Sequence, residues 1–416
     1  MKNQISVQTI SISRNIIDVQ FNIEGNIEIY FNRNIQSFHI EYSCNIENVP
    51  HSIAIIPFIT NILPIVWLTD STLIIPEFDQ TFYESIPKIK KGYVEMSPML
   101  SFNGNIIVHK IVDNTYPTEK NAAFFSGGLD AFTTLIAHIK ETPILITIFG
   151  ADLKLNDKTG IERVQAHTES TIKQFNLPFG LYIKTNFREF INEQQLTQLI
   201  KKSKDGWWHG YQCGIGLIGH AAPLAYIHHL KTIYIASSNT QENEIICASA
   251  PSIDNQVKFG NTNIWHDQYE LNRQEKTRLI TNYCSNYEQQ ISLRVCWQSS
   301  GGSNCCQCEK CTRTMMGLLA EGVDPQKYGF DQYTSNFHFN KNQIVKYIKD
   351  LPKCVKFEWR NIQNRFIETS RYKNDSNINW IYRINVYKEH SFIYKFLRKI
   401  NRLRLHIYYK IKNIHG

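Results

Sequence analysis

The sequence predicts an α/β protein with a parallel sheet, an N-terminal β-rich domain and a C-terminal helical extension. Two observations predict this class. Between residues 119 and 325, short apolar segments alternate with helix-length amphipathic segments, which is typical of βαβ units. Before residue 118 apolar residues recur with period two, and after residue 326 helical spacing dominates. We therefore expect three domains, 1–118, 119–325 and 326–416, in this chain of 416 residues.

The N-terminal region is predicted to form strands. Alternation rich in Ile, Val, Phe and Tyr covers residues 5–13, 19–31, 37–46 and 102–112. The uncharged segment 52–69 has nearly the length of a membrane-spanning helix, but two prolines and an asparagine interrupt it. We favour a buried strand–turn–helix there over a transmembrane span. The first residues lack the continuous apolar run of a signal peptide, so we expect a cytoplasmic protein whose ten cysteines are thiols or metal ligands.

The middle region is predicted to alternate strands with helices. The expected strands are 121–125, 143–150, 179–187 and 232–238, and the expected helices are 130–140, 160–175 and 214–230. Ligands of such sheets bind beyond the carboxyl ends of the strands. Ser126, Gly150 and Ser237 follow three of these strands and are therefore candidate binding residues.

Charge is concentrated at the C-terminal end. The net charge is +8, and residues 371–416 hold eleven Lys and Arg against two acidic residues, which leaves the rest of the chain nearly neutral. Apolar and basic residues interleave at helical spacing in 391–414, so we expect a basic amphipathic helix that contacts nucleic acid or an anionic membrane surface. The alternative is a terminal helix that docks its aromatic face on the body of the protein.

A glycine pair stands between the first strand and the first helix of the middle region, in "FFSGGLD". Gly127 and Gly128 let backbone N–H groups converge, and the following helix adds its positive end, so this loop is a candidate phosphate site. Ser126 can donate its hydroxyl, and Asp130 can cap the helix or hold Mg²⁺. The alternative is a plain tight turn with Asp130 as helix cap.

The cysteine cluster is the strongest pattern in the sequence. Cys305, Cys308 and Cys311 have C-x₂-C-x₂-C spacing, and Cys296 precedes them across a flexible linker. Four thiolates suit tetrahedral Zn²⁺, and the short spacers let a turn wrap the ion. An iron–sulfur cluster is the alternative. Cys306, adjacent to a ligand in the chain, is expected to point elsewhere.

The residues 126–130, Ser-Gly-Gly-Leu-Asp, resemble the SGGxDS loop of the PP-loop ATP pyrophosphatases. This resemblance implies a fold of the adenine nucleotide alpha hydrolase-like (HUP) type. It also implies that the loop, Leu129 included, cradles the pyrophosphate end of ATP while the enzyme adenylates a substrate. The family has Ser or Thr at the next position, where this chain has Ala131. One hydroxyl contact to the phosphates is thus lost, unless Thr133 or Thr134 supplies it.

The loop and the cysteine spacing together resemble the 7-cyano-7-deazaguanine synthase (QueC-like) branch of these enzymes, from residue 120 to about 320 and in the same order. In that branch zinc is structural and stiffens the lid over the site. The resemblance also places Gly150, Asp152, His209 and Gly210 near nucleotide or substrate. The N-terminal region, the basic tail and the segment 236–280 depart from that enzyme, so the chain resembles a longer QueC-like family whose substrate is not indicated.

The tryptophan-rich segment before residue 214 offers further candidates. Trp207 or Trp208 could stack on a purine while His209 hydrogen-bonds phosphate or substrate. The alternative is an aromatic core with an exposed histidine. Cys213 and Cys247 are predicted to be buried small residues rather than nucleophiles.

Two cations three residues apart could act on the leaving group. Arg273 and Lys276 share a predicted helix face and could neutralise the charge that develops on departing pyrophosphate. The alternative is a solvated helix face, which the pattern favours for Lys276.

The sequence therefore predicts an ATP- and Mg²⁺-dependent enzyme that contains Zn²⁺. A carboxylate or carbonyl oxygen of an unidentified acceptor would attack the α-phosphorus, and ammonia or an amine would then attack the activated carbon. We also consider a homodimer. The alternatives are an RNA- or tRNA-modifying enzyme that uses the basic tail, and a regulatory protein that binds nucleotide without turnover, for which Ala131 is the best support.

Overall fold

One mixed sheet organises the protein. The computed structural model describes residues 3–243, 245, 247–296, 302–334 and 337–388. In these residues eleven strands pair in the order β10-β11-β9-β6-β7-β8-β3-β2-β1-β4-β5. The strands are β1 Gln4–Ser13, β2 Ile16–Glu24, β3 Ser37–Tyr42, β4 Thr72–Asp79, β5 Asn105–Val112, β6 Lys120–Phe124, β7 Ile144–Phe149, β8 Gly180–Thr185, β9 Leu230–Ala236, β10 Lys258–Phe259 and β11 Thr262–Asp267.

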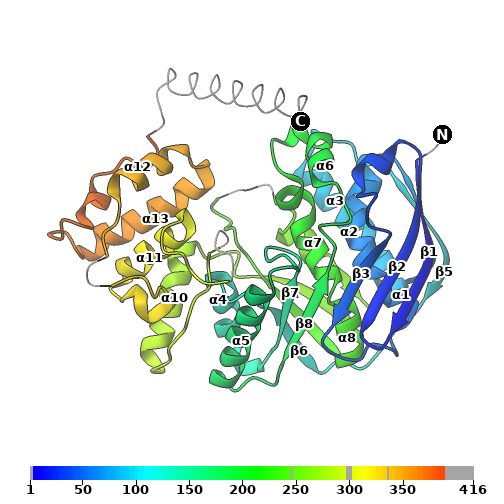
Figure 1. Ribbon diagram of the computed structural model, residues 1–416, viewed down its shortest axis with the longest axis horizontal. Helices are drawn as coiled ribbons and strands as arrows, with labels where there is room; N and C mark the ends of the chain where they lie inside the picture. Colours follow the sequence, from blue (N-terminus) through cyan, green and yellow to red (C-terminus); the bar gives the residue numbers. More distant parts are fainter. Residues whose placement is uncertain (1–2, 244, 246, 297–301, 335–336, 389–416) are drawn as a thin grey trace.

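Helices cover the sheet on both faces (Figure 1). They are α1 His51–Ala54, α2 Ile56–Leu68, α3 Gln80–Met96, α4 Leu129–Ala137, α5 Lys158–Gln174, α6 Glu193–Leu199, α7 Cys213–Gly219, α8 Ala222–His228, α9 Pro251–Asp254, α10 Arg273–Asn286, α11 Glu309–Glu321, α12 Lys341–Asp350 and α13 Lys353–Thr369. A π-helical turn, η4 Trp208–Gln212, precedes α7. Side-chain caps fix several helix starts, such as the reciprocal Asn272–Glu275 capping box of α10.

The centre of the sheet is parallel, as the alternating pattern predicted. The neighbours β11, β9, β6, β7 and β8 all pair in parallel. Alternation along each strand divides the core between the two faces. Ala122 packs in the cluster that contains α2, α7 and α8, and its neighbour Ala123 packs in the cluster that contains α4, α10 and α11. The protein is thus α/β with a large, mostly parallel mixed sheet.

The N-terminal strands extend this same sheet. Strand β3 pairs antiparallel with β8, for example Ile40 with Thr185, so the sheet runs across residue 118 without interruption. Residues 1–118 are also less β-rich than expected, because α1, α2 and α3 lie among their strands. The segment 52–69 is helical rather than strand–turn–helix. Pro57 lies in the first turn of α2, where a proline costs no hydrogen bond, and the burial of every residue of this helix except Leu68 outweighs the internal Pro64.

The helical C-terminal part packs as a separate layer. Helix α13 contacts α10 and α11 around a second core that includes Trp359 and Phe366. Figure 1 shows α10–α13 at one end of the molecule and β1, β2 and β5 at the other. No helix in the described ranges is long and apolar enough to cross a membrane. The predicted basic helix 391–414 lies outside the described residues.

Candidate functional site

A cavity lies where the strand order reverses. From β6 the chain passes to β7 and β8 on one side and returns to β9 on the other, so β6 stands at a switch point of the sheet. The ends of β6, β7 and β9 meet there around a cavity of about 450 Å³, a volume that suits a small-molecule ligand. Residues predicted from the sequence line it, among them Ser126, Gly128, Leu129, Asp130, Asp152, His209 and Arg273.

The glycine loop connects β6 to α4 at this edge. Gly127 adopts φ +73°, and a Cβ there would lie 2.7 Å from the His167 ring, so only glycine fits without strain. Gly128 is the N-cap of α4 and no side chain caps the helix. The first-turn amides of α4 therefore remain available to an anion, since helix geometry gives them no intrahelical partner.

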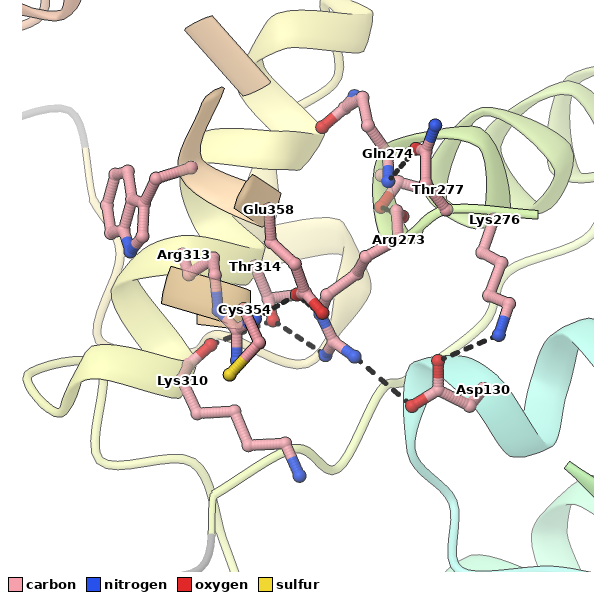
Figure 2. Close-up of polar contacts among 12 residues, drawn as sticks. Asp130, Arg273, Gln274, Lys276, Thr277, Lys310, Arg313, Thr314, Cys354 and Glu358 are labelled. Atoms are coloured by element: carbon pink, nitrogen blue, oxygen red, sulfur yellow. Dashed lines mark hydrogen bonds and ion pairs between the residues drawn. The ribbon is translucent and has the colours of Figure 1, made fainter. Parts of the chain in front are cut away.

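Asp130 is an ion-pair residue and not the helix cap. Its Oδ2 lies 3.1 Å from Arg273 Nη1, and its Oδ1 lies 3.6 Å from Lys276 Nζ (Figure 2). Burial opposes ionisation, but Arg273 and Lys276 together hold the pKa of Asp130 below its usual range. The pair joins the first turn of α4 to the first turn of α10.

Lys276 is buried, which overturns the solvated alternative favoured by the pattern. Its side chain is only 2% exposed, and Nζ donates to Ser237 O at 2.5 Å as well as facing Asp130. The ammonium thus ties the end of β9 to the glycine loop. It does not line the cavity.

Two further cations face the cavity. Arg294 donates from Nε to Ser126 O at 3.0 Å and from its backbone N to Gly127 O at 2.7 Å, which fixes the loop. Lys310 lines the cavity from the first turn of α11, and no hydrogen bond or ion pair in the described residues holds its ammonium (Figure 2). Burial lowers the pKa of both side chains, and Arg273 lowers that of Lys310 further. An anionic ligand would compensate the positive charges of Arg294 and Lys310 and so raise the pKa of both side chains again.

Three predicted residues lie behind the cavity wall. Gly150 has φ +100°, and a Cβ there would lie 2.0 Å from Thr185 O, so it is required for the close approach of β7 to β8. Ser237 is fully buried and its hydroxyl donates to Asn239 O. A Cβ on Gly210 would lie 3.0 Å from Asp205 Oδ2. The glycine at this position therefore leaves room for the Asp205 carboxylate.

The tryptophan segment divides between core and cavity. Trp207 is fully buried, whereas Trp208 lines the cavity with Arg188 4.4 Å from its ring. His209 also lines the cavity, and its Nδ1 lies 2.7 Å from Asp205 Oδ2. Asp152, which follows β7, is exposed and also lines the cavity.

Ala131 stands where the PP-loop enzymes have a serine or threonine, so the structure must show whether another hydroxyl takes that place. Thr133 and Thr134 are both fully buried in α4, and Thr133 Oγ1 donates to Leu129 O. Neither threonine lines the cavity. The hydroxyl that Ala131 lacks is therefore not replaced by either of the two candidates.

The four predicted cysteines come together. The Sγ atoms of Cys296, Cys305, Cys308 and Cys311 all lie within 4.8 Å of one another, with 3.8 Å between Cys296 and Cys308 and 4.0 Å between Cys305 and Cys311. Tetrahedral ligands 2.3 Å from an ion are about 3.8 Å apart. The cluster could thus bind a metal and is compatible with zinc. Cys306 stands outside this group, as expected.

A single asparagine braces the cysteine cluster. Asn304 Oδ1 accepts from the backbone N of Val295 and Cys296, and its Nδ2 donates to Leu293 O and Gly329 O. Cys308 caps α11 by accepting from the N of Cys311. The cluster therefore joins the segment that contains Arg294 to α11, the helix that presents Lys310.

The sequence pattern did not single out Arg294 or Lys310, and it assigned Cys213 and Cys247 no place in the site, but all four residues line the cavity. Arg294 and Lys310 lie close to the predicted metal-ligand cysteines in the chain. A basic residue near the cysteine motif could therefore have indicated that these two side chains belong to the site. Cys213 and Cys247 have no local signal, because they are 34 residues apart and meet only in the fold, with 3.7 Å between their sulfurs.

Comparisons with known proteins yield no match: neither a protein-family model nor a curated sequence corresponds to this chain. The cavity itself combines a glycine loop, an uncapped helix N-terminus, three lining cations and an apolar wall that includes Ile146, Ile148 and Leu217. Such a site suits a ligand with an anionic end and an apolar end.

Proposed function

We propose that the protein is an ATP-dependent enzyme that adenylates a carboxylate or carbonyl oxygen of its substrate for attack by a nitrogen nucleophile. One observation carries the proposal: the loop 126–130 opens α4 at the switch point of the sheet, opposite Arg273, Arg294 and Lys310. The QueC-like resemblance of the loop and cysteine spacing agrees with this chemistry.

The cations would act on the leaving group. The amides at the start of α4 would hold the β- and γ-phosphates, and Lys310 and Arg294 would neutralise pyrophosphate as it leaves the α-phosphorus. Asp130 would position Arg273 through their ion pair. The protein contributes positioning and electrostatics, because pyrophosphate departure needs no covalent catalyst.

Mg²⁺ would arrive with the nucleotide. Asp130 does not fit as its ligand, since two cations already lie within 4 Å of that carboxylate. The exposed Asp152 on the cavity wall fits better, because Mg²⁺ is commonly held by one carboxylate together with substrate phosphates. This assignment replaces the expectation that Asp130 holds the ion.

We propose zinc in the cysteine cluster, in a structural role. Each thiolate of a four-iron cluster binds a different iron, which sets the sulfurs farther apart than the 3.8 and 4.0 Å found here. A single tetrahedral ion fits these distances. By joining the Arg294 segment to α11, it would hold two of the lining cations in place.

The experiment is incubation with Mg·ATP, ammonia and a panel of carboxylates that includes 7-carboxy-7-deazaguanine, followed by mass spectrometry of nucleotides and adducts. The proposal predicts AMP, pyrophosphate and a new amide or nitrile adduct. Formation of ADP would contradict it. The exposed Lys327, replaced by Ala, serves as the control for Lys310→Ala.

A non-catalytic nucleotide-binding protein is the second candidate. The observation in its favour is that neither Thr133 nor Thr134 replaces the hydroxyl that Ala131 lacks. It predicts tight ATP binding without AMP across the whole panel.

A further inference from the structure

Three side chains outside the phosphate loop form a connected polar group on the cavity wall. Asp205 Oδ2 lies 2.7 Å from His209 Nδ1, and the His209 imidazole also interacts with the Cys247 thiol. Both His209 and Cys247 line the same cavity as the glycine loop. An acid, an imidazole and a thiol in this sequence of contacts form the arrangement by which proteins activate a cysteine nucleophile.

The fold holds these groups together through close backbone packing. The N of Ala248 donates to His209 O at 2.9 Å, which sets the residue after Cys247 against the turn that carries the histidine. A Cβ on Gly214 would lie 2.4 Å from Ala248 O, so this approach depends on glycine at the start of α7. The imidazole belongs to the π-helical turn η4, and such turns are frequent at functional sites.

The charges favour a thiolate beside an imidazolium. Asp205 and, after it, Cys247 raise the pKa of His209 to about 10. The Cys213 thiol and His209 lower the pKa of Cys247 despite its burial. The Cys213 sulfur lies 3.7 Å from that of Cys247 and keeps its proton, since its own pKa is raised, and this thiol also lies within hydrogen-bond distance of His209 O, at 3.3 Å. A lowered thiol pKa is the usual property of a reactive cysteine.

We propose that Cys247 is a covalent nucleophile that takes the acyl group from the adenylated substrate, with protonated His209 as the ion-pair partner of its thiolate and Asp205 as the positioning residue. This inference rests on the proposed adenylation. It changes the prediction made from the sequence, in which Cys247 was a buried small residue.

The step balances without a further reagent. The Cys247 thiolate attacks the acyl carbon of the acyl adenylate, a C–S bond forms, and the C–O bond to AMP breaks with its electron pair leaving on AMP. The amine or ammonia then attacks the thioester carbon, and the C–S bond breaks to restore the thiolate. The amine releases its proton to solvent, and His209 stays protonated beside the thiolate.

The test uses iodoacetamide on the full-length reduced protein at pH 6, without nucleotide, with peptide mass spectrometry of each cysteine. We expect Cys247 to react at least tenfold faster than in the urea-unfolded chain and faster than the half-buried Cys354. Replacing His209 with Ala should slow Cys247 at least tenfold. Equal rates for Cys247 in folded and unfolded protein, or no effect of H209A, would overturn the proposal.

The matched control is another histidine–aspartate pair outside the cavity. His39 Nδ1 lies 2.9 Å from Asp18 Oδ1, and H39A should leave the alkylation of Cys247 unchanged. Far-ultraviolet circular dichroism and thermal unfolding verify that the H209A and C247S proteins fold. Because alkylation is measured without nucleotide, a slow reaction of Cys247 would contradict its role as nucleophile without bearing on the proposed adenylation. If the C247S variant forms AMP and synthesises the amide at the full rate, the covalent step is contradicted while the proposed adenylation stands.

Discussion

Arg273 and Asp130 form the ion pair that joins α10 to the glycine loop, with 3.1 Å between Nη1 and Oδ2 and with the arginine side chain only 10% exposed. The two residues are 143 positions apart in the chain. Their contact fixes the position of Arg273 relative to the N-terminus of α4. The proposed phosphate ligand would contact both.

Replacing Asp130 with Asn should destabilise the fold and reduce turnover. The change removes the carboxylate that Lys276 faces and leaves Arg273 with Glu358 alone, 3.8 Å from its Nε, which costs about 2–4 kcal/mol for a mostly buried network. Urea unfolding measures the loss. The surface pair Lys91–Glu95 provides the control, because Glu95→Gln should cost under ~1 kcal/mol.

The contribution of Asp130 to the free energy of unfolding should decrease as the pH falls. Since the folded pKa lies below the unfolded value near ~4, the carboxylate stabilises the fold above that pH, and the contribution is lost as pH falls through the folded pKa. The difference in unfolding free energy between wild type and D130N should therefore be constant from neutral pH to about 5 and shrink below about 4. A difference that grows on acidification would refute the ion-pair account.

Lys310→Ala should weaken binding of pyrophosphate and of the ATP phosphates. A charge-assisted hydrogen bond is worth about 1.5–3 kcal/mol, so the dissociation constant should rise roughly ten- to hundredfold. Calorimetric titration with pyrophosphate measures this effect. Lys327→Ala, at an exposed lysine, should leave affinity unchanged, and equal affinities for wild type and K310A would remove Lys310 from the site.

Elemental analysis should find one zinc ion per chain. Cys308→Ser removes a ligand that also caps α11, so it should abolish stoichiometric zinc and lower the melting temperature. Cys306→Ser should retain zinc, because Cys306 stands outside the cluster. Iron with inorganic sulfide in place of zinc would show that the alternative metal centre is correct.

Gly150→Ala should destabilise the protein by at least about 2 kcal/mol, because the residue has φ +100° and the new Cβ would lie 2.0 Å from Thr185 O. Thermal unfolding measures the change. Gly206→Ala is the matched control, since nothing lies within 4 Å of its Cβ position. Similar melting temperatures for both variants would contradict the steric account.

Cys247 should alkylate at a nearly constant rate from pH 6 to 8 and slow only towards its lowered pKa of about 5. An unperturbed thiol, with pKa near ~8.5, would instead gain about tenfold per pH unit over this range. Iodoacetamide kinetics decide between the two profiles. The titratable groups that face the pair are Asp205, Cys213, Asp254 and Tyr93.

Local patterns were sufficient for the parallel centre of the fold. The strands at β6, β7, β8 and β9 follow from short apolar runs, and the glycine loop follows from its place between strand and helix. The four metal-ligand cysteines were found because C-x₂-C spacing is itself the geometry of a turn around an ion.

Long-range pairing was not available from the sequence. Nothing local shows that β3 pairs with β8, since register between distant strands depends on the whole sheet. The helix α2 was mistaken because an apolar segment buried on all sides has no period that separates helix from strand. The contact between His209 and Cys247 was not predicted for a related reason, although each residue was considered by itself. The contact depends on the packing of the Cys247 loop against η4.

The most direct test of the central claim follows oxygen from substrate to AMP. Carboxylates of the panel are labelled with ¹⁸O in the carboxyl group and incubated with the protein, Mg·ATP and ammonia. If the carboxylate attacks the α-phosphorus, AMP should carry one ¹⁸O atom, and K310A should form this labelled AMP more slowly than K327A. Unlabelled AMP, or ADP in its place, would contradict adenylation of the substrate.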